Sequence, residues 1–172
     1  MDISATDRKF LESAISIARQ TADLGNYPVG SVLTIDDTLV DSAGNEINTK
    51  QSYVQHAENS LIIRNGQKLS EAFQANTNIV LYSTLEPCIQ CLGAAVTNHV
   101  NKIVYIQSDP NGGACNLSHD NIGDWYKHTW PEILHLPISE EPKDMMISFF
   151  HREISHGNTK WPTKMLHLLG VA

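Results

Sequence analysis

The chain has 172 residues, of which 41% are hydrophobic, so it is long and apolar enough for one packed domain and unlike a disordered chain. Its net charge of -7 argues against a broad basic surface for nucleic acid, although it leaves room for a local basic groove. No apolar run approaches the roughly 20 residues of a membrane span, and residues 1–4 do not resemble a signal peptide. We therefore expect a cytoplasmic protein without a membrane segment.

Hydrophobic periodicity and turn residues predict alternating helices and strands. In the first half we expect a helix over 10–24 begun by Thr6 or Asp7, a hairpin of strands 29–35 and 38–43, a short helix over 57–65 ended by Gly66, and a strand over 78–84. In the second half we expect a helix over 87–98, a strand over 102–107, a long loop over 109–130, a strand over 133–138, a helix over 142–155 and a helical tail over 165–169. The strand–helix–strand order over 78–107 is typical of a right-handed crossover. The whole pattern predicts a three-layer α/β fold.

Two short motifs carry the chemistry, His56-Ala57-Glu58 and Pro87-Cys88-Ile89-Gln90-Cys91. A catalytic zinc site takes three protein ligands and leaves a fourth position for water. Cys88 and Cys91 stand three residues apart at a predicted helix start, where they share a face and where exposed N–H groups favour thiolate. With His56 as the third ligand, and no further Cys or His at a matching short spacing, the sequence predicts an open site for one Zn2+ per chain.

Glu58 completes the interpretation of this site. Water bound to zinc ionises near neutral pH, and a nearby carboxylate can pass its proton to a ring nitrogen and a leaving amine. The combination H-x-E with P-C-x-x-C is the signature of zinc deaminases. Because residues two apart do not share a helix face, His56 should lie at the helix entry and Glu58 in the first turn. A lone Cys-x-x-Cys is also compatible with a redox pair or with packed thiols, but the combined motif makes coincidence a poor explanation.

These residues resemble the cytidine and deoxycytidylate deaminase superfamily, most closely its purine-acting branch of guanine deaminases and tRNA adenosine deaminases. The likeness covers roughly residues 10–109. It rests on Tyr27-Pro28-Val29-Gly30-Ser31-Val32-Leu33, on Asn45, on Gln55-His56-Ala57-Glu58 and on the stretch from Ser83 to Ala94, which is similar to T-L-E-P-C-x-M-C-x-G-A. Two departures are visible, since Ser31 stands where the family usually has Ala and Gln90 where it usually has Met.

The resemblance implies a fold and a set of substrate contacts. It implies an α/β/α sandwich with a mixed five-stranded sheet, usually in a homodimer. It also implies that Asn45 binds the base, that the backbone N–H of Ala57 lies near the base, and that Asp109 lies near the substrate. The alternative for Asn45 is a turn residue after Gly44, because asparagine favours turns.

Substrate identity depends on the region after about residue 109, where the family pattern stops. We expect one deaminase domain over residues 1–172, with a divergent lid and helical region there. The C-terminal Lys and Arg residues are scattered among acidic ones, which favours a free base or small nucleoside, with a guanine-type purine first and no nucleic acid. The alternatives are a tRNA adenosine deaminase and a cytosine or cytidine deaminase. A non-catalytic zinc-binding domain is least favoured, because a structural site has no use for Glu58.

The long loop predicted over 109–130 is a candidate lid. Its aromatic residues, Trp125 and Tyr126 among them, could stack on a flat ring, but they are equally compatible with a core or interface role. Cys115, in the same loop, is interpreted as a spare thiol.

Overall fold

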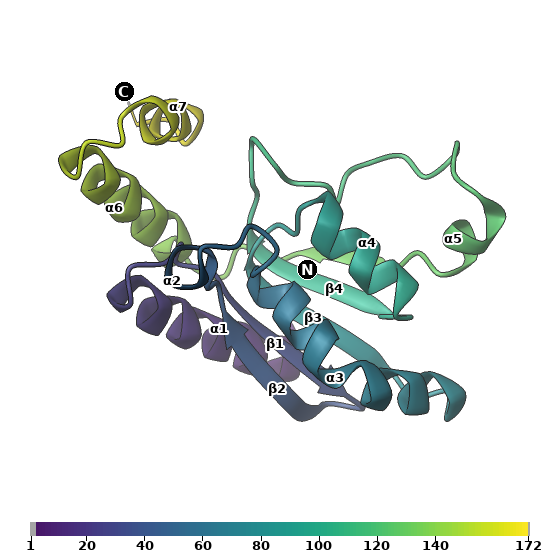
Figure 1. Cartoon of the computed structure of the whole chain (residues 1–172). Coiled ribbons are helices and arrows are strands. Elements are labelled where there is room, and N and C mark those ends of the chain that lie inside the picture. The colour runs from purple at the N-terminus through teal and green to yellow at the C-terminus, as the bar shows by residue number, and fades with distance from the viewer. Residues whose placement is uncertain (1–2, 172) are drawn as a thin grey trace.

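The computed structural model describes residues 3–171, which form a single five-stranded sheet flanked by helices (Figure 1). The strands are β1 (Gly30–Ile35), β2 (Thr38–Gly44), β3 (Ile79–Leu85), β4 (Lys102–Gln107) and β5 (Glu132–His135). Their order is β2-β1-β3-β4-β5. Strand β1 runs antiparallel to β2 and β3, whereas β3, β4 and β5 are parallel to one another. The mixed sheet and the parallel crossover through residues 79–107 are therefore confirmed.

The helices form the two outer layers of the sandwich. They are α1 (Ala5–Asp23), α2 (Ile47–Lys50), α3 (Ala57–Gln74), α4 (Ile89–Thr97), α5 (Asp124–His128), α6 (Glu141–Ser155) and α7 (Lys160–Leu168). Helix α1 covers one face of the sheet with α6 beside it, α3 and α4 cover the other face, and α7 packs on α6 (Figure 1). Over residues 3–171, no helix has both the length and the apolar character needed to cross a bilayer.

Strand alternation divides the core between the two faces. On β1, Val32 packs with Phe10 of α1, while its neighbour Leu33 packs with Leu61 of α3. All four side chains are at most 2% exposed. Burying each such side chain stabilises the fold by roughly 1.5–3 kcal/mol, and because side chains alternate along a strand, one strand serves both layers.

Gly30 sets the distance between α1 and the sheet. A Cβ at this position would lie 2.2 Å from the backbone oxygen of Ala14, so only glycine fits where the helix crosses β1. Helix α1 is in turn tied to α6. Arg19 Nη2 donates to Glu141 Oε2 at 2.8 Å, and Arg152 Nη1 donates to the backbone oxygen of Ala22 at 3.1 Å. Strand β1 therefore packs against α1, and α1 is in turn hydrogen-bonded to α6.

Several boundaries differ from those expected from the sequence. The cap of α1 is Ser4, whose side chain accepts from the backbone nitrogen of Asp7, in place of Thr6 or Asp7. Helix α3 does not stop at Gly66, because Leu69 and Ala72 continue its buried stripe; it is only kinked at Asn65. The long loop contains the short helix α5, and α7 begins five residues earlier than the predicted tail.

Candidate active site

Three side chains with metal-binding atoms converge where two helices begin. His56 is the N-cap of α3 and Cys88 is the N-cap of α4, both in extended backbone conformations, and Cys91 lies in the first turn of α4. His56 Nδ1 lies 3.6 Å from Cys88 Sγ and 3.5 Å from Cys91 Sγ, and the two sulfurs are 3.7 Å apart. The donor atoms all lie within 4.8 Å of one another. The sequence prediction that His56 lies outside the regular helix is confirmed.

The charges at this cluster suit a cation. Hydrogen bonds from Cys91 and His56 lower the pKa of Cys88 to about 3, although burial opposes this effect. The hydrogen bond to Cys88 together with burial raises the pKa of Cys91, and the hydrogen bond with Cys88 raises the pKa of His56. Cys88 is therefore a thiolate at neutral pH, which is the metal-binding form of cysteine. Two cysteine sulfurs and one imidazole are a donor set typical of a catalytic zinc site with one open position.

Glu58 lies in the first turn of α3 beside these donors, and only 3% of its surface is exposed. Burial raises the pKa of its carboxyl group. Ser83 Oγ donates to Glu58 Oε1 at 3.0 Å, and Oε2 lies 3.5 Å from Cys91 Sγ. A carboxylate held in this position can exchange a proton with a group bound at the open side of the metal site.

His56, Glu58 and Cys88 line a cavity of about 540 Å³, a size common for small-molecule sites. Asn45 and Asp109 line the same cavity. A further wall, the α6–α7 wall, comes from these two helices and the segment between them: Met146, Phe150, Asn158, Trp161 and Met165. Among residues 3–171, no lysine or arginine lines this cavity.

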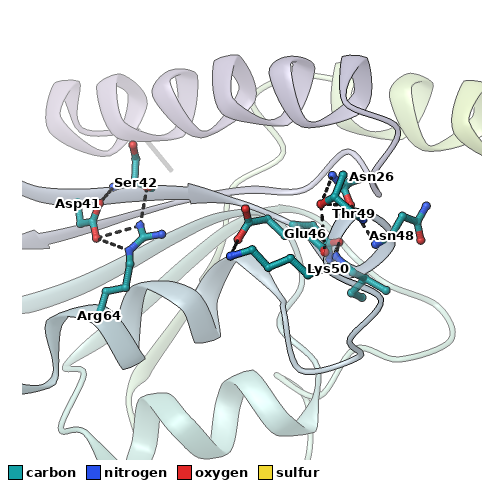
Figure 2. A network of polar contacts seen from close by, with 10 residues as sticks. Asn26, Asp41, Ser42, Glu46, Asn48, Thr49, Lys50 and Arg64 are labelled. Carbon is teal, nitrogen blue, oxygen red and sulfur yellow. Dashed lines mark hydrogen bonds and ion pairs between the residues drawn. The ribbon is translucent and has the colours of Figure 1, made fainter.

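Asn45 reaches the cavity on a tightly fastened turn. Its backbone nitrogen donates to Val29 at 2.9 Å, and its Oδ1 accepts from the backbone nitrogen of Ile47 at 3.0 Å. Behind this turn, Oδ1 of the buried Asn26 accepts from the backbone nitrogens of Asn48 and Thr49, both at 3.0 Å (Figure 2). Asn45 therefore closes a turn and also lines the cavity, and its contact with a base stays a prediction.

Asp109 is placed by a buried carboxylate. Glu86 Oε2 accepts from the backbone nitrogen of Asp109 at 3.1 Å, and its Oε1 accepts from that of Cys115 at 3.0 Å. A Cβ on Gly113 would lie 2.4 Å from the Glu86 carboxyl group, so the loop can approach this closely only with glycine there. The residue just before Pro87 thus holds the loop that carries Asp109 beside the zinc ligands.

The remaining sequence-predicted residues have less direct positions. Ala57 begins α3 between His56 and Glu58; the whole residue is 0% exposed and does not line the cavity, so a contact between its backbone N–H and a base stays a prediction. Cys115 is buried and lies outside the metal-donor cluster, and burial raises its pKa to about 12.

The aromatic residues of the long loop do not line the cavity. Trp125 packs edge-on against His99 beyond the end of α4, with ring centroids 5.7 Å apart, and neither Trp125 nor Tyr126 lines the cavity. Trp161 and Asn158, further along the chain, line it instead. The amphipathic pattern over 142–155 was the available signal for the α6–α7 wall, because its apolar residues Met146 and Phe150 face the cavity.

The fold and the donor set together define a zinc-dependent hydrolytic deaminase, and comparisons with known proteins agree. The model of the cytidine and deoxycytidylate deaminase zinc-binding region matches residues 4–107. A tRNA-specific adenosine deaminase of Bacillus subtilis is 31% identical over 144 residues, which are 84% of this chain and 88% of that protein.

Solved structures show the same fold. A chain from studies of A-to-I editing by tRNA:A34 deaminases at the wobble position of transfer RNA superposes with a TM-score of 0.61 at 25% identity, over 77% of this chain and 100% of that chain. The guanine deaminase of Nitrosomonas europaea superposes with a TM-score of 0.60 over 87% of this chain and 86% of that chain, and at 13% identity this shows the fold alone. The chain belongs to the cytidine and deoxycytidylate deaminase family, in the branch of tRNA adenosine deaminases and guanine deaminases. His56, Cys88 and Cys91 are its zinc site.

Proposed function

We propose that this chain deaminates adenosine in transfer RNA, with Glu58 as the proton carrier. The observation that carries the proposal is its 31% identity, over most of both chains, to a tRNA-specific adenosine deaminase. The sequence favours a guanine-type free base, with a tRNA adenosine deaminase as an alternative. The identity to this relative supports the alternative. Two lysines next to the cavity are available to contact RNA, because Lys160 and Lys164 flank Trp161, which lines the cavity, on α7. Such cations can contact phosphates even on a protein of negative net charge.

The residues divide the work of the reaction. Zinc bound at His56, Cys88 and Cys91 supplies a Lewis acid that lowers the pKa of water to near neutrality. Glu58 takes one proton from the attacking water and gives it to the purine ring nitrogen, then takes the second proton from the new hydroxyl group and gives it to the amine, which leaves as ammonia. Asn45, Asp109 and the backbone N–H of Ala57 hold the edge of the base. Apolar side chains of α6 and α7 cover the ring and exclude water from the reacting atoms.

A free guanine-type base is the second candidate, and one observation favours it. The described lining of the cavity holds no lysine or arginine, and α7 contributes Trp161 and Met165 to it. A site built in this way can enclose a small neutral ring without phosphate contacts. Under this alternative, α7 closes over a bound base instead of making room for a nucleotide in RNA.

One substrate panel separates the two candidates. The zinc-loaded chain is assayed for inosine in an anticodon stem-loop with adenosine at its first position, and for ammonia from guanine, adenine, adenosine, cytosine and cytidine. We expect inosine in the stem-loop, with a rate that falls as salt rises because phosphate contacts are screened. The same stem-loop with guanosine at that position is the matched control. Ammonia from guanine, with no inosine from the stem-loop, would establish the second candidate instead.

The outer surfaces of α3 and α4 support a homodimer. Ile63 of α3 is 72% exposed and Ile89 of α4 is 64% exposed, these two helices are in contact, and an apolar patch shared by neighbouring helices marks an interaction surface. We expect light scattering to give twice the mass of one chain. Ile63→Glu and Ile89→Glu should shift the protein toward the monomer.

A further inference from the structure

Two buried serines stand next to Glu58 without lining the cavity. Ser31 of β1 and Ser83 of β3 are partners across the antiparallel strand pair, and both are 0% exposed. Ser31 Oγ donates to Ser83 Oγ at 3.2 Å, and Ser83 Oγ donates to Glu58 Oε1 at 3.0 Å. Ser31 is one of the two departures from the family pattern, because alanine usually stands at this position. Ser31 therefore adds a hydroxyl group that is linked to Glu58 through the hydroxyl group of Ser83.

The geometry determines the direction of the Ser83 proton. A serine hydroxyl has one proton to donate and two lone pairs to accept with. Ser83 Oγ is surrounded by two donors, Ser31 Oγ at 3.2 Å and the backbone nitrogen of Leu85 at 3.4 Å. With both lone pairs engaged, its single proton points at Glu58. Ser83 is thus a donor of fixed orientation, whereas an unsupported serine hydroxyl rotates.

This contact divides the two oxygens of the Glu58 carboxylate. Oε1 is held by Ser83, and Oε2 lies 3.5 Å from Cys91 Sγ, on the side of the zinc ligands. We propose that Ser83, oriented by Ser31, is a positioning residue for deamination, which stops the carboxylate from rotating and keeps Oε2 facing the reacting atoms. The inference rests on the proposed role of Glu58 as proton carrier.

Kinetics separate positioning from a structural role. Removing one hydrogen bond to a charged group should lower kcat of Ser83→Ala about tenfold, while KM and zinc content stay unchanged. Ser31→Ala should lower kcat about threefold, because Ser83 keeps its proton but loses one of the donors that orient it. The matched control is Thr34→Val, which removes an equally buried hydroxyl from the opposite face of β1 and should leave kcat unchanged. Each variant is assayed on whichever of the stem-loop or free guanine the wild type converts.

Infrared spectroscopy tests the contact without turnover. The carboxyl band of Glu58 is identified by its loss in Glu58→Gln, and it should shift in Ser83→Ala but not in Thr34→Val. An unshifted band would overturn the proposed contact, and a shifted band with unchanged kcat would overturn the positioning role. If the wild type converts neither substrate, the proposed function fails, and the band alone then decides whether Ser83 holds Glu58.

Discussion

The metal site and the α6–α7 wall of the cavity are built differently. At the metal site, four side chains come from two helix starts, and each makes a short contact with another member of the group. In the α6–α7 wall, apolar side chains predominate, and Trp161 remains 37% exposed. The metal site is held by many mutually dependent contacts, whereas the α6–α7 wall is held mainly by packing. We infer that a substitution at the metal site abolishes chemistry, while one in the α6–α7 wall changes which ring is bound.

Loss of a zinc ligand should have the largest effect. Cys91→Ser removes one of three ligands, so we expect zinc content to fall and activity to drop by about a thousandfold or more, since the metal contributes several kcal/mol of transition-state stabilisation. Metal analysis and the deamination assay measure both. Cys115→Ser changes a buried thiol outside the donor cluster and should keep its zinc. If Cys91→Ser binds zinc and is active, the contacts of the metal site are less dependent on one another than we infer.

Glu58→Gln should separate metal binding from proton transfer. The amide keeps the size of the side chain but cannot carry the proton, so we expect kcat to fall by about 10²–10⁴ with zinc retained. Single-turnover assays and metal content give the two readouts. Retention of both zinc and full activity is the result that would assign the proton transfer to another group.

Trp161→Ala tests the role of the α6–α7 wall in substrate binding. The indole lines the cavity, and stacking of a base on an aromatic ring is worth about 1–3 kcal/mol, so we expect KM to rise about tenfold while kcat changes little. Trp125→Ala is the control, because that ring packs on His99 away from the cavity. A loss confined to kcat would mean that α7 takes part in chemistry and not only in binding.

Arg64→Ala should have the smallest effect, since it lies in neither region. Arg64 donates to Asp41 Oδ2 at 2.9 Å on the surface (Figure 2), and an exposed pair is worth about 0.2–1 kcal/mol. Burial raises the pKa of Asp41, but hydrogen bonds from Asn65 and Arg64 outweigh it and lower the pKa. The stabilisation is therefore present above the ordinary aspartate pKa and is lost as the pH falls through the lowered value. In urea unfolding, the difference between Arg64→Ala and wild type should be largest at pH 7 and should shrink as the pH falls through the lowered pKa of Asp41.

The metal site could be predicted from the sequence because its residues lie close together along the chain. His56 and Glu58 are two residues apart, Cys88 and Cys91 are three apart, and both pairs stand at helix starts, so spacing alone restricts their geometry. The hairpin was equally predictable, since Asp36 and Asp37 adopt the positive φ angles of a tight turn.

The missed features depend on neighbours that are distant in the sequence. Trp161 meets the cavity only because α7 folds back over α6, which no periodicity reveals. Ser83 contacts Glu58 because β3 lies behind α3, and the two residues are 25 positions apart. Gly66 predicts a helix end, but the helix continues because buried Leu69 holds it beyond this residue, and a Cβ built at Gly66 would meet nothing within 4 Å.

A side chain at position 30 should disturb the cavity wall, although Gly30 itself does not line the cavity. Any side chain there pushes α1 away from the sheet at Ala14, and α1 is bound through Arg19 and Arg152 to α6, whose Phe150 forms part of the cavity wall. A methyl group on β1 should therefore displace the cavity wall through α1 and α6. In a screen for lost activity, Gly30 will score like a substrate-binding residue, although it has no side chain with which to touch one.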